Sequence, residues 1–113
     1  MSKDYIPAAE VMPLADLASV SDGSITSRIL AKNAGGSVTL FAFDTGQGLA
    51  EHTAPFDALV MVLDGSLKLT IGGNAVIATP GSVVRMPAHI PHAVDAHEPT
   101  RMLLTMLRDP KAA

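Results

Sequence analysis

The sequence predicts an all-β domain of the sandwich, jelly-roll or barrel type. Three observations favour this class. Short apolar segments recur along the chain, turns containing glycine or proline separate them at regular intervals, and no segment carries a long helical repeat. With 113 residues the chain corresponds to one domain, which is long enough to bury a single hydrophobic core.

The first 23 residues are predicted to form an N-terminal arm. Pro7 and Pro13 discourage a regular helix, so we expect an extended arm or a single helical turn. Asp22-Gly23 is a turn signal, and two strands follow at residues 24–31 and 37–44.

The positions of the remaining strands are predicted from the turns between them. Asp64-Gly65, Gly72-Gly73-Asn74 and Pro80-Gly81 each separate two apolar segments, as hairpin and turn residues do. Pro55 marks the segment before it as an edge or bulged strand. The predicted strands are 51–53, 58–63, 66–71, 75–79, 82–86, 92–96 and 100–107. Residues 24–108 therefore make up the domain, and residues 109–113 are expected to be a frayed tail.

Composition indicates a covered outer surface. Apolar residues make up 48% of the chain and charged residues 17%, against about 25% charged in an average soluble domain. In residues 58–63 apolar side chains occur at both strand parities, so one set must point away from the core. We expect the segment 8–31 and a second subunit to cover this face, which predicts a homodimer with strand 24–31 in its interface.

Charge and cysteine content exclude several classes of protein. The net charge of −3 and the lack of a basic block argue against a nucleic-acid partner. The absence of cysteine excludes disulfides, a thiolate nucleophile and cysteine-based metal sites. No uninterrupted apolar stretch approaches 18 residues and no signal peptide is visible, so we expect no membrane span and a cytoplasmic location.

Two stretches, residues 46–65 and 81–96, each run from a glycine turn into an apolar segment that carries a histidine. Because side chains alternate along a strand, His52, Ala54 and, beyond the Pro55 break, Ala58 are expected on one inner face. An antiparallel neighbour would place His92 opposite that face. The pattern therefore predicts a shared cavity lined by two imidazoles and two small side chains.

The first stretch resembles the first motif of the cupin superfamily. Gly46, His52 and Gly65 fall on the spacing of that motif, whereas Ala54 replaces its second histidine and Ala58 its glutamate. The resemblance implies a cupin-type double-stranded β-helix, which is a jelly-roll barrel. It also implies that two of the four usual metal-ligand positions are alanine here.

The second stretch resembles the second cupin motif. Gly81, Pro87 and His92 match it, while His89 stands in place of a glycine and Ala96 in place of an asparagine. The resemblance covers about residues 37–107 and suits a small single-domain cupin.

The resemblance implies a ligand pocket around His52 and His92, with Ala54, Ala58 and Met86 as further lining residues. Neutral imidazole binds Zn, Fe, Ni and Cu, and we expect a weakly bound divalent transition metal (Zn, Fe, Ni or Mn) on the two histidines. Protein metal sites supply three or four ligands. A third ligand would come from Glu51, Asp57, His89 or a bound molecule.

Each candidate residue also has a structural interpretation. Either pocket histidine could be a core residue held by a carbonyl, and His89 and His97 could be ordinary surface residues. Arg85 suits a surface ion pair, and the methionines suit packing, since methionine fills irregular gaps.

Two functions stay open. One is a small-molecule-binding barrel, with a metal-dependent enzyme of the oxygenase or isomerase kind as a further possibility. Without a metal, either histidine could serve as a general acid or base. The other is a non-catalytic ligand sensor or structural homodimer with a vestigial site.

Overall fold

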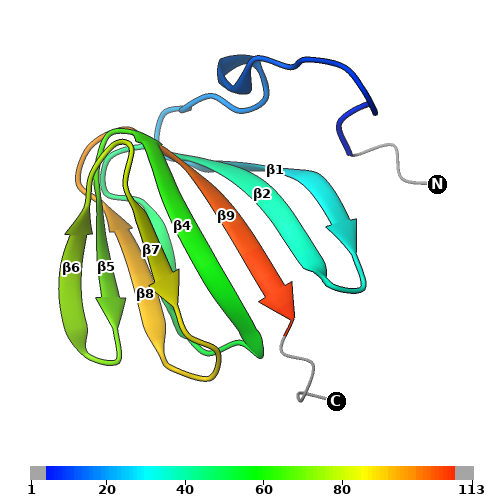
Figure 1. The fold of residues 1–113 in the computed structure, drawn as a ribbon. Helices are drawn as coiled ribbons and strands as arrows, with labels where there is room; N and C mark the ends of the chain where they lie inside the picture. The colour runs from blue at the N-terminus through cyan, green and yellow to red at the C-terminus, as the bar shows by residue number, and fades with distance from the viewer. Residues whose placement is uncertain (1–4, 109–113) are drawn as a thin grey trace.

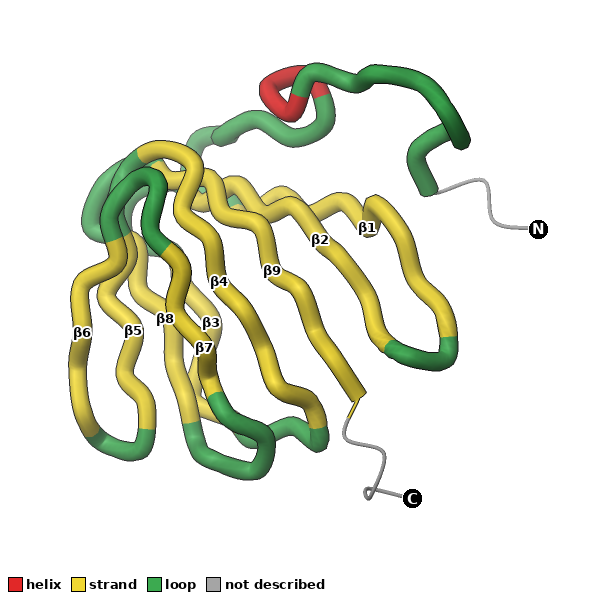
Figure 2. The backbone as a smooth tube through the Cα atoms, viewed as in Figure 1, coloured by secondary structure: helices red, strands yellow, loops and turns green. Residues whose placement is uncertain are grey.

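The structure is a computed structural model that describes residues 5–108. These residues form two antiparallel sheets that face each other across an apolar core (Figure 1, Figure 2). The predicted all-β class is confirmed. The elements are η1 (Leu14–Asp16), β1 (Ile25–Asn33), β2 (Gly36–Phe43), β3 (Gly48–His52), β4 (Phe56–Asp64), β5 (Leu67–Ile71), β6 (Asn74–Ala78), β7 (Val83–Met86), β8 (His92–Ala96) and β9 (Thr100–Arg108).

The chain crosses repeatedly between the two sheets, as it does in a jelly roll. One sheet has five strands in the order β1-β2-β9-β4-β7, and the other has four in the order β3-β8-β5-β6. After β2 the chain moves to the smaller sheet for β3, returns for β4, and repeats this exchange until β9. The crossings bring β3 beside β8 and place β4 between β7 and β9.

The predicted strands are all present, with ends displaced by a few residues. The largest displacement is at the third strand, expected at 51–53 but found as β3 (Gly48–His52). Gly48 lies outside the predicted range but inside the strand, where the carbonyl of Val94 approaches it so closely that a Cβ atom would clash. Glycine at this position lets the two backbones approach closely, because it has no Cβ atom.

The main core lies between the sheets. Alternate residues of β4 and β5 point into it, and Val60, Val62, Leu67 and Leu69 are almost completely buried. The buried hydroxyl of Thr100 accepts a hydrogen bond from the backbone N–H of Ser66 and has two backbone carbonyl oxygens within donating distance, so this polar group is satisfied.

A second apolar cluster lies on the outer face of the five-stranded sheet. Leu17 and Ala18 of the N-terminal arm pack against Leu30, Leu40 and Ala42 of β1 and β2. Figure 2 shows the arm, with its single short helix, running alongside these strands. Where the sequence left an extended arm or a single helical turn open, residues 5–23 run as an extended segment that contains the short helix η1.

The predicted frayed tail at 109–113 lies outside the described residues, as do residues 1–4 of the arm. Among residues 5–108 no helix is long and apolar enough to cross a membrane.

Candidate functional site

The two motif histidines lie side by side on the four-stranded sheet. His52 ends β3 and His92 begins β8, and the two residues are paired directly across that ladder. Directly opposed side chains of an antiparallel pair share one face of the sheet. Their ring centroids are 4.5 Å apart and their planes meet at 69°, so one ring presents its edge to the other.

Each imidazole is oriented by a backbone carbonyl two residues before it. The Nδ1 atom of His52 lies 2.8 Å from the carbonyl oxygen of Ala50, and that of His92 lies 3.2 Å from the carbonyl oxygen of Ile90. A carbonyl oxygen can only accept, so each Nδ1 carries the donated hydrogen. In the neutral rings Nε2 therefore holds the lone pair that is available to a ligand.

The two histidines differ in exposure. His52 is exposed at the mouth of the site, whereas His92 is only 5% exposed. Burial lowers the pKa of His92 below its usual value of 6.5, the hydrogen bond to Ile90 opposes this effect, and the neighbouring His52 lowers the pKa further. His92 is therefore neutral at pH 7.

Both rings line one cavity between the two sheets. Its volume is about 40 Å³, which is room for roughly three water molecules or a few ligand atoms. The lining is mostly apolar, and the imidazoles are its polar groups. The lining residues are Leu49, His52, Ala54, Phe56, Ala58, Met86, His92, Val94, Met102, Leu104 and Met106.

The structure brings together all five residues that the sequence placed in the pocket: His52, Ala54, Ala58, Met86 and His92. Six further lining residues were missed, three of them on β9. Their alternation at positions 102, 104 and 106 could have indicated an inward face. However, the apolar residues between them hid that signal, and nothing in the sequence shows that β9 lies beside β4.

The carboxylates proposed as a third metal ligand lie elsewhere. Asp57 accepts hydrogen bonds from the backbone N–H of Ala88 at 2.9 Å and from Arg85 at 3.4 Å. The predicted surface ion pair of Arg85 is therefore confirmed. Glu51 is exposed on β3 and lines no part of the cavity.

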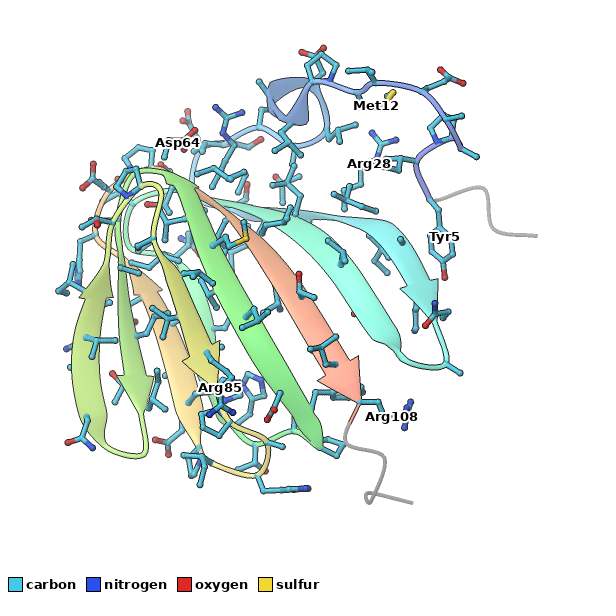
Figure 3. All side chains as sticks on the ribbon, in the orientation of Figure 1. Tyr5, Met12, Arg28, Asp64, Arg85 and Arg108 are labelled. Carbon is cyan, nitrogen blue, oxygen red and sulfur yellow. The ribbon has the colours of Figure 1, made fainter. Side chains whose placement is uncertain are left out.

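The loop between β7 and β8 is bonded to Ala54, one of the residues that line the cavity. The backbone N–H of His89 donates to the carbonyl oxygen of Ala54 at 2.9 Å, and His89 adopts the left-handed conformation with φ of 65°. Together with the Asp57 contacts, this hydrogen bond ties the β7–β8 loop to Ala54 and to the start of β4. Figure 3 shows Arg85 toward this end of the sandwich and Asp64 toward the other end.

The donor set does not fit a four-ligand divalent metal site. Among residues 5–108 no group of three or more His, Cys, Asp or Glu side chains could hold an ion. Two imidazoles remain, and protein sites for such metals usually supply three or four ligands.

The geometry and the two motifs agree with a comparison against protein families. The family model described as "Cupin domain" matches residues 39–107, which is more than half of the chain. The chain belongs to the cupin family. The matched region includes both histidines and every strand that contributes to the cavity of this cupin.

Solved structures of similar fold include other cupins. A conserved protein of unknown function from Streptococcus pyogenes is 33% identical, with a TM-score of 0.87 and 96% of each chain covered. A cupin superfamily protein from Desulfitobacterium hafniense is 28% identical, with a TM-score of 0.85 and coverage of 95% of this chain and 97% of that one.

More distant structures share the fold alone. KdgF from Halomonas sp. is 22% identical, with a TM-score of 0.69 and coverage of 82% of this cupin and 89% of that chain. No curated protein matches the sequence.

Proposed function

We propose that this cupin binds a small organic molecule in the cavity between its sheets. The ligand has only a few heavy atoms, with a short apolar part and one polar group, such as a carbonyl or carboxyl, that contacts His52 and His92. The observation that carries this proposal is the paired imidazoles with both Nδ1 hydrogens engaged, at the mouth of an otherwise apolar cavity. Ligand sites of this kind combine an apolar lining with a few polar groups that fix orientation.

The histidine pair can also move a proton. His92 is neutral at pH 7, so its Nε2 can accept a hydrogen bond or a proton from the ligand. His52 lies at the mouth, where it can exchange a proton with solvent. This arrangement suits acid–base chemistry on the polar group of the ligand, such as an isomerisation.

We assign the ligand contacts to the imidazoles themselves. A resident divalent metal would need ligands beyond the two histidines, and Ala54 and Ala58 supply none. A divalent ion held by the two Nε2 atoms would therefore bind weakly and would complete its shell with water or the ligand. No step of the proposed chemistry passes through such an ion.

A second candidate is a non-catalytic homodimer, for which the outer face of the five-stranded sheet provides an argument. Met61 and Val83 are neighbours across the β4–β7 ladder and are 41% and 58% exposed. The N-terminal arm packs on the β1–β2 side of this sheet. A second copy of the chain would cover the apolar surface that remains.

Light scattering tests the second candidate. We expect a mass of two chains at micromolar concentration, and we expect Met61→Glu to shift it toward the 11.7 kDa of one chain. A wild-type protein that has the mass of one chain would contradict the homodimer.

The ligand proposal is tested by screening small carboxylic acids and ketones with metal-free, untagged protein. Binding is followed through the imidazole nitrogen resonances. We expect the Nε2 resonances of both cavity histidines to shift, and His52→Gln and His92→Gln to weaken binding. His97→Gln is the matched control, because His97 is exposed and does not line the cavity. Undiminished binding in a variant with both cavity histidines replaced would refute the proposal.

A further inference from the structure

A guanidinium group lies beside the cavity, at the end where its mouth opens. Arg108 at the end of β9 is paired directly with Phe56 at the start of β4, and Met106 is paired with Ala58 on the same two strands. Because side chains two residues apart share a face, Phe56 and Arg108 lie on the face that carries Ala58 and Met106. Phe56, Ala58 and Met106 line the cavity, so Arg108 lies one step outward from its wall.

Two contacts hold this guanidinium in place. Its central carbon lies 5.3 Å from the centroid of the Phe56 ring, which is a cation–π contact. Its Nε donates a hydrogen bond of 2.9 Å to the carbonyl oxygen of Ala34. Within the described part of the chain no carboxylate is paired with Arg108, whereas Arg85 and Arg101 each pair with an aspartate. Arg108 therefore offers its terminal N–H groups to a ligand.

The acidic side chains at this end of the sandwich do not pair with Arg108. Asp57 at the start of β4 is paired with Arg85 at 3.4 Å. Glu51 is exposed on β3 and lies outside the cavity lining. Figure 3 shows Arg85 and Arg108 toward one end of the sandwich and Asp64 toward the other end. An anionic group at the mouth is thus favoured by Arg108 and meets no carboxylate from the cavity wall.

We propose that Arg108 selects an anionic ligand for this cavity and that the ligand is a short oxo acid. Its carboxylate binds the guanidinium beside the mouth, and its carbonyl end enters the cavity and reaches His52 and His92. Guanidinium matches the planar, forked geometry of a carboxylate and forms charge-assisted hydrogen bonds with it. The cavity of about 40 Å³ holds only a few atoms, and a carboxylate bound outside it leaves that space to the rest of the ligand. This inference rests on the function proposed above and adds the charge of the ligand and the residue that recognises it.

Charged and uncharged probes of the same shape test this assignment. Pyruvate and levulinate, which differ in the distance between carbonyl and carboxylate, are each compared with the primary amide of the same acid. Binding to metal-free, untagged, full-length protein is followed through the imidazole nitrogen resonances of His52 and His92. We expect wild-type protein to bind at least one of the acids about tenfold or more tightly than its amide, because hydrogen bonds to a charged acceptor are stronger. Added salt should reduce this preference.

Substitutions of Arg108 test whether this residue carries the preference. Arg108→Gln should lower the affinity for the acid by about tenfold and leave the affinity for the amide unchanged. Arg108→Lys keeps the charge but loses the forked geometry, so it should retain only part of the preference. Arg28→Gln is the matched control, because Arg28 lies on β1, has no ion pair with another described residue and does not line the cavity. It should change neither affinity, and melting temperatures show whether each variant is folded.

Several results would overturn the inference. They are equal affinities of the wild type for acid and amide, an unchanged preference in Arg108→Gln, or an equal loss of acid and amide binding in that variant. The last result would reduce Arg108 to a support for the Phe56 wall. If the probes still shift the resonances of His52 and His92 in these cases, the proposed function stands without the arginine. Wild-type protein that binds neither acid would overturn the inference as well, and the proposed function would then be decided by the uncharged ketones of the wider screen.

Discussion

Filling the cavity should stabilise the fold and abolish binding. Ala58 is 3% exposed, lies on the central strand β4 and borders the cavity. The change Ala58→Val adds two methyl-sized groups to the floor. Each buried methylene contributes about 0.8 kcal/mol, so complete accommodation would raise the free energy of unfolding by about 1.6 kcal/mol. Partial strain should reduce this gain to about 1 kcal/mol.

The matched control is Ala42→Val. Ala42 is also completely buried, on β2 of the same sheet, but it packs against the N-terminal arm and borders no described cavity. Extra volume in a filled core costs about 1–3 kcal/mol. The two alanines should therefore respond to the same substitution with opposite signs.

Urea unfolding of the two variants and the wild type measures these differences in stability. A changed midpoint urea concentration with an unchanged m-value reports a change in the free energy of unfolding. The expected gain for Ala58→Val also corresponds to a melting temperature higher by about 4–8 °C. Ligand binding should fall in the same variant, because the valine side chain occupies the space of the ligand. A loss of stability in Ala58→Val as large as that in Ala42→Val would refute the assignment of open space beside position 58.

Three further predictions concern the ligand set and the turns. Replacing Ala54 with His and Ala58 with Glu should raise divalent metal occupancy, measured by elemental analysis, whereas unchanged occupancy would show that these positions cannot complete a site. Hydrogen bonds from two backbone N–H groups lower the pKa of Asp44 below 3.8. Wild type should therefore be more stable than Asp44→Asn above about pH 4, and this advantage should shrink as the pH falls through the lowered pKa. A difference that does not change with pH in the acid range would contradict this account. Gly65→Ala should destabilise the protein by more than about 1 kcal/mol, and by more than Gly73→Ala. Both glycines have positive φ, but only at Gly65 would a Cβ meet neighbouring backbone. Equal losses of stability in the two variants would show that the close contact at Gly65 contributes nothing beyond the cost of the positive φ.

The sequence was sufficient for the strands and for the inner face, but not for the whole lining. Glycine turns and apolar alternation located the strands, and β8 was predicted with the ends that the structure shows. The pairing of His52 with His92 was anticipated because both motifs keep their spacing around one strand pair. The sequence did not predict that Met106 lines the cavity. That position depends on β9 lying between β2 and β4, a long-range pairing that no local pattern indicates.

Strand ends were misplaced where backbones approach closely. The third strand was predicted to begin at residue 51, yet Gly48 already lies in β3, facing the carbonyl of Val94. Gly36 shows the same effect at the start of β2, where a Cβ would meet the backbone of Met106. In both cases the neighbouring strand requires the glycine, and that strand is distant in sequence.

The orientation of the two imidazoles does not depend on an ion. Each ring is held by a carbonyl oxygen two residues earlier on its own chain, and the rings contact each other edge to face. Replacing two ligand positions with Ala54 and Ala58 therefore changes what the cavity can bind without releasing His52 or His92. The alanines also open the space against which Met86 and Met106 lie. The choice of ligand therefore depends on a few side chains that the strand pairings bring into one cavity.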